Sequence, residues 1–502
     1  MKRLFNFFIL FFFCNVSMAE TGAEHATAMY FNSIKNNPEK LSVFLQAMPK
    51  GGDLHNHLGG VSWAENMLVY AKQDDLCINI KNFSAKSRPN CQKQYRVAQI
   101  QKFPILYNQV IDAWSMRNFQ PGKESGHDHF FATFEKYLPI LFKHRREMVN
   151  EAVERACREN ILYLELMIMP DDNQSGLLGR HIAWDNHLDR LREKLLKSGV
   201  AAIVSNISKQ FDIYQRSLLT FLNGPGKQQC PDFKLRYLYQ ALREQPPAQV
   251  FAQLLTGFEL ASRDPRVVGI NLVQAEDGPI SMRDYHLQMQ MIGFLHHLYP
   301  RVKISLHAGE LVPDLVPRSG LRFHIREAVE IAHAHRIGHG VAILYEDKAR
   351  QLLQEMAKKQ ILVETNLSSN AAILNVKGQQ HPILLYREYH VPIALSTDDE
   401  GVLRTDLTEQ FKTAVVNYHF SYGVLKQLVR NSIDYSFLPG ASFWQDNHYQ
   451  HPVSVCRSSL NNSQLSASCQ HFLASSEKAD LQWKLEQQLS YFEQQFLHKK
   501  KG

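Results

Sequence analysis

The sequence contains no apolar run long enough to cross a membrane. Its most apolar stretch, residues 4–13, covers ten positions, whereas a spanning helix needs about 20. Lys2 and Arg3 precede this stretch, and Ser17-Met18-Ala19 follows it with small residues in the spacing of a cleavage site. This order is typical of a secretory signal peptide. The sequence therefore predicts a signal peptide at 1–19 and a secreted or periplasmic protein without a stable membrane span, with an uncleaved anchor as the alternative.

Excess charge is also scarce. The formal net charge is +7, but five cationic residues close to the two ends account for most of it, and without them about +2 remains (7 − 5). These five are Lys2, Arg3, Lys499, Lys500 and Lys501. A protein that binds the phosphates of nucleic acid needs a concentrated basic face. The charge balance thus argues against nucleic acid as a partner.

No Cys-x-x-Cys motif occurs, which disfavours a zinc site built from cysteines. The seven cysteines become six once the signal peptide, which contains Cys14, is removed. In an oxidising compartment, close pairs in polar segments are expected to form disulfides. Two pairs meet this description, Cys77 with Cys91 and Cys456 with Cys469. Cys157 lies in a helical pattern and is predicted to be a buried free thiol.

Between about residues 50 and 400, apolar segments rich in β-branched residues alternate with longer helical patterns. Eight segments have the character of strands: 52–58, 161–168, 201–206, 267–273, 302–307, 336–340, 361–366 and 392–397. Strands and helices that alternate in this number predict a closed parallel (β/α)8 barrel, the TIM barrel. A chain of 502 residues with 44% hydrophobic and 21% charged residues suits one such domain with insertions.

The barrel does not account for the whole chain. We predict an N-terminal helical segment at 20–48, a barrel domain at 49–444 and a C-terminal loop and helix at 445–502. Residues 72–128, after the first predicted strand, contain Cys77, Cys91 and several prolines and are predicted to form an insertion. The final helix carries large apolar residues on one face, which indicates packing against the barrel. That face consists of Leu481, Leu485, Leu489, Phe492 and Phe496.

Two histidines in the first predicted strand have the spacing of a shared site. In Asp53-Leu54-His55-Asn56-His57, alternation along the strand sends His55 and His57 to the same side. Both imidazoles can therefore point into the barrel. By itself this pattern also fits a pair of core or surface histidines.

Three later strands end in further polar clusters. These are His307-Ala308-Gly309-Glu310, Gly338-His339-Gly340 and Thr397-Asp398-Asp399. Catalytic residues of a barrel come from the C-terminal ends of several strands. Together with the first strand, the clusters predict an active site at that end of the barrel.

Three neutral imidazoles and one carboxylate suit one Zn²⁺ and leave a position for water. The ligands that we predict are His55, His57, His307 and Asp398. Glu310 has no obvious cationic partner in the sequence, which suits an acid that donates a proton. His339 and Asp399 remain to orient the water and the substrate.

These motifs resemble those of the adenosine deaminase family of amidohydrolases. The resemblance rests on Pro49-Lys-Gly-Gly-Asp-Leu-His-Asn-His-Leu58, Ser305-Leu-His-Ala-Gly-Glu310, Arg336-Ile-Gly-His-Gly340 and Ser396-Thr-Asp-Asp399. It extends from about Met48 to Trp444. The signal peptide and the cysteine-bearing insertion further resemble the family's secreted branch, the adenosine deaminase-related growth factors.

The resemblance implies hydrolytic removal of the 6-amino group of adenosine, and of 2′-deoxyadenosine, outside the cytoplasm. It implies that water activated by the metal attacks C6 of the purine while Glu310 protonates N1. It also implies that His339 and Asp398 handle the proton of the water and that Asp399 hydrogen-bonds N7. Addition at C6 puts electron density on N1, so a neutral carboxylic acid there stabilises the transition state if burial raises its pKa. Ammonia leaves, and an inosine-type product remains.

The resemblance also suggests contacts with the substrate. A segment before a long predicted helix is similar to the family's apolar cover over the substrate, and ordinary helix packing explains it equally well. Its aromatic residues are Phe130, Phe131 and Phe134. Relatives usually carry glycine where Gln274 stands, with its backbone N–H close to N3 of the purine. The Gln274 side chain is expected to enter the pocket or, if the loop shifts, to point to solvent.

Several alternatives stay open. The same barrel could deaminate another aminopurine, such as adenine or a nucleotide, or act as a secreted signalling or binding protein, as a monomer or a homodimer. A complete catalytic set argues against a pure binding protein. The neighbouring His127 and His129 are expected to be exposed loop residues. The His-x-Glu and Pro-Cys-x-x-Cys motifs of cytidine and nucleic-acid base deaminases are absent, which disfavours that class.

Overall fold

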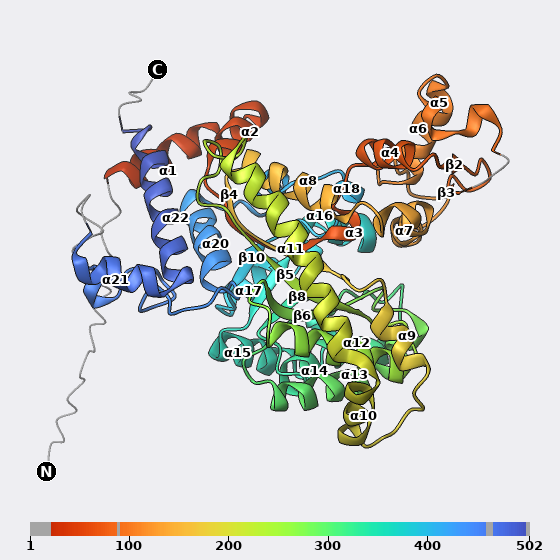
Figure 1. Cartoon of the computed structure of the whole chain (residues 1–502). Helices are drawn as coiled ribbons and strands as arrows, with labels where there is room; N and C mark the ends of the chain where they lie inside the picture. The colour runs from red at the N-terminus through yellow and green to blue at the C-terminus, as the bar shows by residue number, and fades with distance from the viewer. Residues whose placement is uncertain (1–21, 88–90, 458–464, 498–502) are drawn as a thin grey trace, which may run out of the picture.

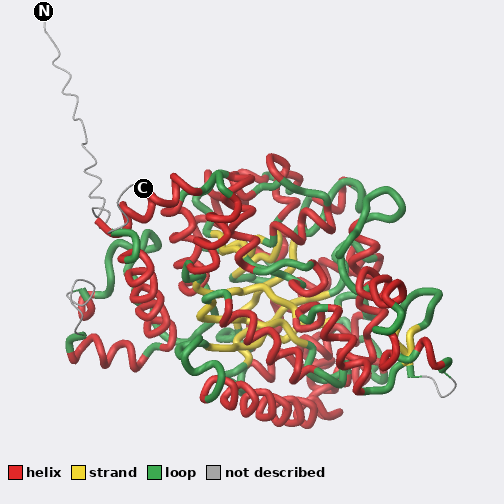
Figure 2. The backbone as a smooth tube through the Cα atoms, turned by 90° about the horizontal axis from the view of Figure 1, so that it is seen from above, coloured by secondary structure: helices red, strands yellow, loops and turns green. Residues whose placement is uncertain are grey.

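The computed structural model describes residues 22–87, 91–457 and 465–497, so the predicted signal peptide lies outside the described residues. Eight parallel strands follow one another around a barrel. They are β1 (Gly51–His57), β4 (Ile161–Ile168), β5 (Lys234–Leu242), β6 (Val267–Val273), β7 (Lys303–Ala308), β8 (Arg336–His339), β9 (Leu362–Thr365) and β10 (Ile393–Leu395). Figure 2 shows the strands in the middle of the molecule with helices around them. The predicted (β/α)8 fold is confirmed.

The first and last strands meet where the polar clusters lie. Asn56 forms an isolated parallel bridge with Asp398. The backbone N–H of Asp398 donates to the carbonyl of His55 at 2.8 Å, and the N–H of His57 donates to the carbonyl of Asp398 at 3.1 Å. These bonds close the barrel and place Asp398 directly beside the two histidines of β1.

Helices cover the outside of the barrel. The longer ones between or after strands are α8 (Arg145–Arg158), α11 (Ala201–Asn223), α12 (Pro247–Ala261), α13 (Pro279–Leu298), α15 (Ala349–Lys359), α19 (Leu407–Tyr418) and α20 (Tyr422–Asp434). The short helices α14 (His324–Glu330) and α17 (Ile383–Glu388) follow β7 and β9. Shorter helices occupy the connections: α3 (Leu58–Val61), α9 (Gln174–Arg180), α10 (Leu188–Leu195), α16 (Leu367–Leu374) and α18 (Glu400–Leu403). The main apolar core lies between strands and helices. None of the helices in the described part of the chain is long and apolar enough to span a membrane.

The strand predicted at 201–206 is wrong. This segment begins the long helix α11, and the third barrel strand is β5. Buried residues recur along α11 every three or four positions, from Val204 and Ile207 to Phe211, which is the period of a helix. A six-residue window that contains β-branched Ile203 and Val204 is too short to show that period.

The N-terminal and C-terminal helices pack together at one side of the barrel (Figure 1). They are α1 (Gly22–Ile34), α2 (Pro38–Ala47), α21 (Ala467–Ser475) and α22 (Glu477–Gln494). Helix α22 contacts α1 and α20, and α20 packs on β1 and β10. The apolar face predicted for the final helix is buried in the main core, from Leu481 to Phe496. The chain ends thus cover the barrel from outside.

The insertion after β1 lies on the opposite side (Figure 1). It contains α4 (Ala64–Gln73), β2 (Cys77–Ile78), β3 (Ala85–Lys86), α5 (Val97–Ile100) and α6 (Pro104–Ala113), and it leads into α7 (Gly126–Leu141). The strands β2 and β3 form a small antiparallel sheet. The predicted Cys77–Cys91 disulfide closes this segment and is confirmed.

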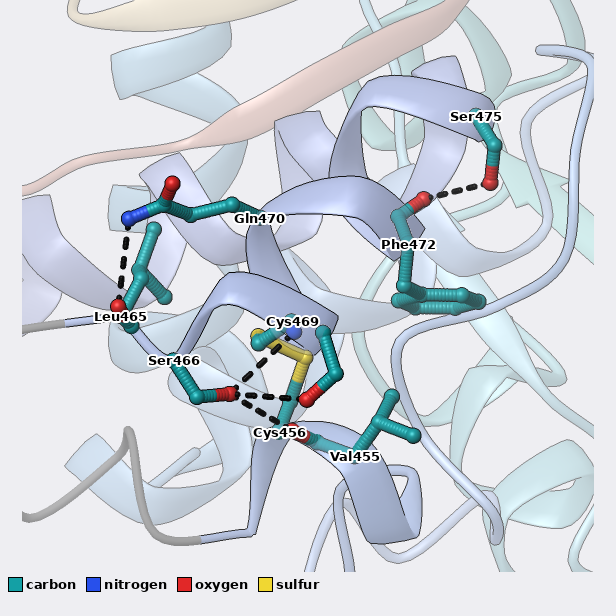
Figure 3. Close-up of a disulfide and its surroundings, with 9 residues drawn as sticks. Val455, Cys456, Leu465, Ser466, Cys469, Gln470, Phe472 and Ser475 are labelled. Carbon is teal, nitrogen blue, oxygen red and sulfur yellow. Dashed lines mark hydrogen bonds between the residues drawn. A yellow bond between two sulfur atoms is a disulfide. The ribbon is translucent and has the colours of Figure 1, made fainter.

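The other four cysteines in the described part of the chain are also paired. The predicted Cys456–Cys469 disulfide is confirmed, and Figure 3 shows it between the segment before α21 and α21 itself. Cys157 is not a free thiol, because it is bonded to Cys230 with a Cα–Cα distance of 5.4 Å. The helical pattern around Cys157 correctly indicates a buried side chain, but it contains no information about a partner 73 residues away.

Loop length predicts that Cys157–Cys230 stabilises the fold most. A crosslink that removes entropy from the unfolded chain contributes about 3 kcal/mol for a loop near 14 residues and about 4 kcal/mol for one near 73. We therefore expect C157A/C230A to lower the free energy of unfolding more than C77A/C91A does, as measured by urea denaturation. C456A/C469A, with a loop of 13 residues, is the matched control and should resemble C77A/C91A. Equal losses in all three double variants would contradict the prediction.

Candidate active site

The predicted site residues converge at the C-terminal end of the barrel strands. A cavity of about 600 Å³ opens there, and His57, His307, Glu310, Asp398 and Asp399 line it. These side chains come from the ends of β1, β7 and β10 or from the turns that follow. The bridge between Asn56 and Asp398 joins the ends of β1 and β10, so the site residues from these two strands lie side by side.

Four donor atoms face one another in this cavity. Nε2 of His307 lies 3.1 Å from Nε2 of His55 and 3.0 Å from Nε2 of His57. Oδ1 of Asp398 lies 3.5 Å from Nε2 of His57 and 3.9 Å from Nε2 of His55. Ligands in a tetrahedral zinc site with bonds of about 2.0–2.1 Å are about 3.3 Å apart. The spacing of these four atoms therefore fits one metal ion.

The other ring nitrogen of each histidine has an acceptor. Nδ1 of His55 lies 2.7 Å from a carboxylate oxygen of Glu364. The corresponding partners are Oε1 of Gln240 for His57, at 3.0 Å, and Oδ1 of Asn271 for His307, at 2.7 Å. With the proton on Nδ1, the Nε2 lone pairs point at one another, which is unfavourable unless a cation lies between them. The tautomers thus support a metal site.

Sequence reasoning missed these three partners. Glu364 and Asn271 are polar residues inside otherwise apolar strands, and that contrast was a usable signal. Gln240 lies on β5. The sequence predicts the third strand at 201–206 instead, so it offers no reason to expect Gln240 at the site.

Burial favours neutral rings at the site. It lowers the pKa of His57 to about 4 and the pKa of His307 well below its usual value. For His55, burial acts in the same direction, but the hydrogen bond and charge of Glu364 outweigh it and raise the pKa. A cation at Nε2 would take the place of that extra proton.

A second group lies beside the donors. His339, the last residue of β8, has Nε2 3.7 Å from Oδ2 of Asp398 and Nδ1 3.6 Å from Oε1 of Glu310. Burial lowers the pKa of His339 to about 3. Burial, together with the carboxylates of Asp398 and Glu276, raises the pKa of Glu310 well above its usual range. The site thus pairs a neutral base with a neutral acid.

The loop that carries Glu310 is held from behind by Glu276. This buried carboxylate accepts the backbone N–H of Gly309 at 2.9 Å and of Glu310 at 2.8 Å, and it lies 2.6 Å from Nδ1 of His324. Gly309 has φ +74, and a Cβ there would lie 2.7 Å from the side chain of Ile325. The His-Ala-Gly-Glu motif therefore needs its glycine for both backbone conformation and space.

Asp399 lies in the same cavity without a partner for its Oδ1, as far as the described residues extend. Burial and the adjacent charge of Asp398 raise the pKa of Asp399 well above its usual range. A protonated, buried carboxyl group with a free position can donate a hydrogen bond to a ligand.

The three predicted phenylalanines of α7 line the cavity. They also pack on one another, with ring centroids 5.1 Å apart for Phe130 and Phe131 and 5.4 Å apart for Phe130 and Phe134. The same side chains therefore form the cavity wall and take part in helix packing. His127 and His129 are not exposed loop residues, because they lie in the first turns of α7 and are partly buried. His127 lies 3.0 Å from Asp277 at the rim of the cavity.

Gln274 stands at the end of β6 in a conformation that favours glycine. Its φ is +83, and its side chain lines the cavity rather than pointing to solvent. Oε1 of Gln274 accepts the backbone N–H of Glu244 at 2.9 Å. The side chain is therefore tied to the neighbouring β5 loop and forms part of the cavity wall.

Because Gln274 lies in the cavity wall, we expect Gln274→Gly to change KM and the preference among adenosine, 2′-deoxyadenosine and larger analogues. The substitution widens the cavity and removes the bond to Glu244, while kcat on the best substrate should move less than tenfold, about 1.4 kcal/mol. Steady-state kinetics with each nucleoside tests this. Gln360→Gly is the matched control, since Gln360 also has a positive φ, +55, but lies outside the cavity. Unchanged kinetics for every substrate would contradict the prediction, and a collapse of kcat alone would indicate a role in the transition state.

Comparison with known proteins agrees with this geometry. The model of the family described as adenosine deaminase matches residues 108–442. The chain is 25% identical over 308 residues to an adenosine deaminase of Clostridium perfringens, covering 60% of this chain and 76% of that protein. It is 23% identical over 402 residues to an adenosine deaminase of Clostridium kluyveri, covering 79% and 92%. Among solved structures, the Arabidopsis N6-mAMP deaminase has a similar fold, with a TM-score of 0.52 and 20% identity over 79% of this chain and 95% of that one.

The family model covers the ends of β7, β8 and β10, where Glu310, His339 and two of the four donor side chains lie. The protein belongs to the adenosine deaminase family.

Proposed function

We propose that this protein is a zinc-dependent hydrolase that converts adenosine and 2′-deoxyadenosine to the corresponding inosine-type nucleoside and ammonia. The observation that carries the proposal is the arrangement around Asp398. Three imidazole Nε2 atoms meet on one side of this carboxylate, and His339 and Glu310 lie on the other.

The donor set favours Zn²⁺ as the metal. Imidazole nitrogens suit Zn²⁺, whereas Mg²⁺ and Ca²⁺ prefer oxygen ligands. His55, His57, His307 and Asp398 would hold one ion per chain. When bound, such an ion lowers the pKa of a coordinated water from 15.7 towards about 7.

Glu310 supplies the proton that the purine needs. Addition of water at C6 shifts an electron pair to N1, and the raised pKa of Glu310 keeps its carboxyl group protonated for donation to that atom. Glu276 holds the backbone of this residue through two hydrogen bonds, so the acid has a defined position.

His339 and Asp398 receive the proton that the attacking water loses. Burial lowers the pKa of His339 and keeps its ring neutral, and its Nε2 lies 3.7 Å from Oδ2 of Asp398, so the two groups are close enough for a proton to pass between them. Asp399 orients the purine ring by donating a hydrogen bond from its protonated carboxyl group to N7, which is an acceptor. The proton held by His339 and Asp398 then passes to the 6-amino group, the C6–N bond breaks and ammonia leaves. The hydroxyl proton on C6 returns to the Glu310 carboxylate, and the 6-oxo product remains.

We further propose that the protein acts outside the cytoplasm and is related to the secreted branch of the family. The disulfides Cys77–Cys91, Cys157–Cys230 and Cys456–Cys469 support an oxidising compartment, because such bonds rarely persist in the cytosol. The predicted signal peptide at 1–19, followed by helical, barrel and C-terminal segments at 20–48, 49–444 and 445–502, agrees with this proposal.

A spectrophotometric assay of the zinc-loaded mature protein against a panel of aminopurines tests the function. We expect adenosine and 2′-deoxyadenosine to be deaminated, with adenine and cytidine as negative controls. Turnover of adenine instead would assign a different amidohydrolase reaction. A protein that holds zinc and deaminates no member of the panel would point to a binding role.

A further inference from the structure

The catalytic cavity is longer than the part that the catalytic groups occupy. Helix α7 runs along it and presents one face, from Phe130 and Phe134 to Leu138 and Leu141. Eleven residues of helix correspond to about 16 Å. At one end, His127 meets Asp277 after β6, and at the other end α7 approaches Met169 after β4. The cavity therefore extends across the mouth of the barrel.

The end near β4 is mainly apolar. Its apolar walls are Leu138, Leu141, Phe142, Met148, Ile168 and Met169. The polar residues that line it are Asn173 and Arg145, whose guanidinium lies 5.4 Å from the centre of the Phe142 ring. Met148 and Ile168 are fully buried behind it, whereas Leu138 and Phe142 are 43% and 39% exposed at its opening. Large apolar side chains that stay exposed beside a catalytic cavity gain from covering by an apolar ligand group.

This end offers little to a phosphate. Of the described residues that line the cavity, Arg145 alone carries a permanent positive charge, and its guanidinium is paired with Asp172. The carboxylates of Glu135 and Glu244 also line the cavity. A phosphate group in this cavity would find no unpaired arginine or lysine among the described lining residues and would share the cavity with two carboxylates.

The chemistry of the base decides which part of a substrate reaches this end. With N1 at Glu310 and N7 at Asp399, C6 lies between these groups and N9 lies on the far side of the purine. The ribose is attached to N9, and its 5′ carbon is the most distant position from the reacting atom. A 5′ substituent therefore extends into the outer cavity.

From these observations we propose that the site prefers an uncharged 6-aminopurine nucleoside with an apolar group on the 5′ carbon and discriminates against nucleotides. This inference rests on the proposed deaminase function. The apolar walls near β4 would cover the 5′ group, and the ribose hydroxyls would stay near the polar groups of the cavity rim.

The test compares three substrates with the zinc-loaded, full mature protein. They are adenosine, adenosine 5′-monophosphate and 5′-deoxy-5′-(propylthio)adenosine. We expect kcat/KM for the propylthio compound to exceed that for adenosine about tenfold, mainly through KM, and kcat/KM for the monophosphate to fall at least about 100-fold below it. A propylthio compound no better than adenosine, or a monophosphate as good as adenosine, would overturn the proposal. Absence of turnover with all three compounds would instead contradict the deaminase function.

A substitution in the apolar wall ties the preference to this surface. Met169→Gln keeps the side-chain length but adds an amide, so the ratio of kcat/KM for the propylthio compound over adenosine should fall towards one. Leu177→Gln, on α9, is the matched control, because Leu177 is 44% exposed and lies outside the cavity. It should keep the wild-type ratio. An unchanged ratio in Met169→Gln would overturn the assignment of the 5′ group to this end.

Discussion

Glu310→Gln is expected to keep the fold and the metal while kcat for adenosine falls about 10³-fold. Glutamine has nearly the shape of glutamate, but its amide cannot give a proton to N1 as a carboxylic acid can. Burial and the charges of Asp398 and Glu276 raise the pKa of Glu310, so the side chain is already neutral in the folded protein. Replacing it by a neutral amide therefore changes the chemistry of the site and little of its electrostatics.

Three measurements on purified Glu310→Gln decide the outcome: zinc content by elemental analysis, thermal unfolding and steady-state kinetics. The matched control is Glu355→Gln, whose carboxylate pairs with Lys359 on the surface of α15. It should keep wild-type kcat. A near-normal kcat in Glu310→Gln would mean that N1 receives its proton from another group. Loss of zinc in this variant would mean that Glu310 holds the site together rather than serving as the acid.

His57→Ala is expected to lose both zinc and activity. Nε2 of His57 lies 3.0 Å from Nε2 of His307 and 3.5 Å from Oδ1 of Asp398, so it is one of the four donors that meet there. Alanine leaves three donors and an opening that water fills. Zinc affinity falls steeply when a ligand is removed, and turnover falls with it because the water is no longer activated. His55→Ala should behave in the same way.

Elemental analysis of washed protein should find one zinc per wild-type chain and none in His57→Ala. His286→Ala is the matched control, because His286 is exposed on α13, pairs with Glu327 and does not line the cavity. It should keep one zinc and full activity. Two tightly held metals per wild-type chain, or a His57→Ala protein that keeps its zinc, would contradict the predicted ligand set.

Much of the candidate site could be predicted because its signals are local. His55 and His57 are two positions apart, so any extended backbone points them to one side. The glycines at 309 and 338 are also required by their immediate surroundings. Gly309 has a positive φ, and a Cβ on Gly338 would lie 2.7 Å from the ring of His55. Short motifs of this kind are visible in the sequence because the backbone next to the site tolerates only glycine at these positions.

Other parts of the site are not local. Gln240 could not be found because its strand, β5, contains Lys234 and Arg236 among apolar residues and resembles a surface segment more than the mainly apolar neighbours β4 and β6 do. The contact between Glu276 and the Glu310 backbone joins residues 34 positions apart. No periodicity along the chain connects them.

By itself, the sequence determined seven of the eight barrel strands, the side chains that meet at the candidate site and the disulfides that close short loops. It could do so because strand alternation, helical period and short loop closure depend on neighbours within a few residues. Only the tertiary structure decided the Cys157–Cys230 bond, the orientation of each histidine by Glu364, Gln240 and Asn271, and the apolar end of the cavity between α7 and Met169. These features arise where distant segments meet, and their geometry depends on how the whole barrel packs.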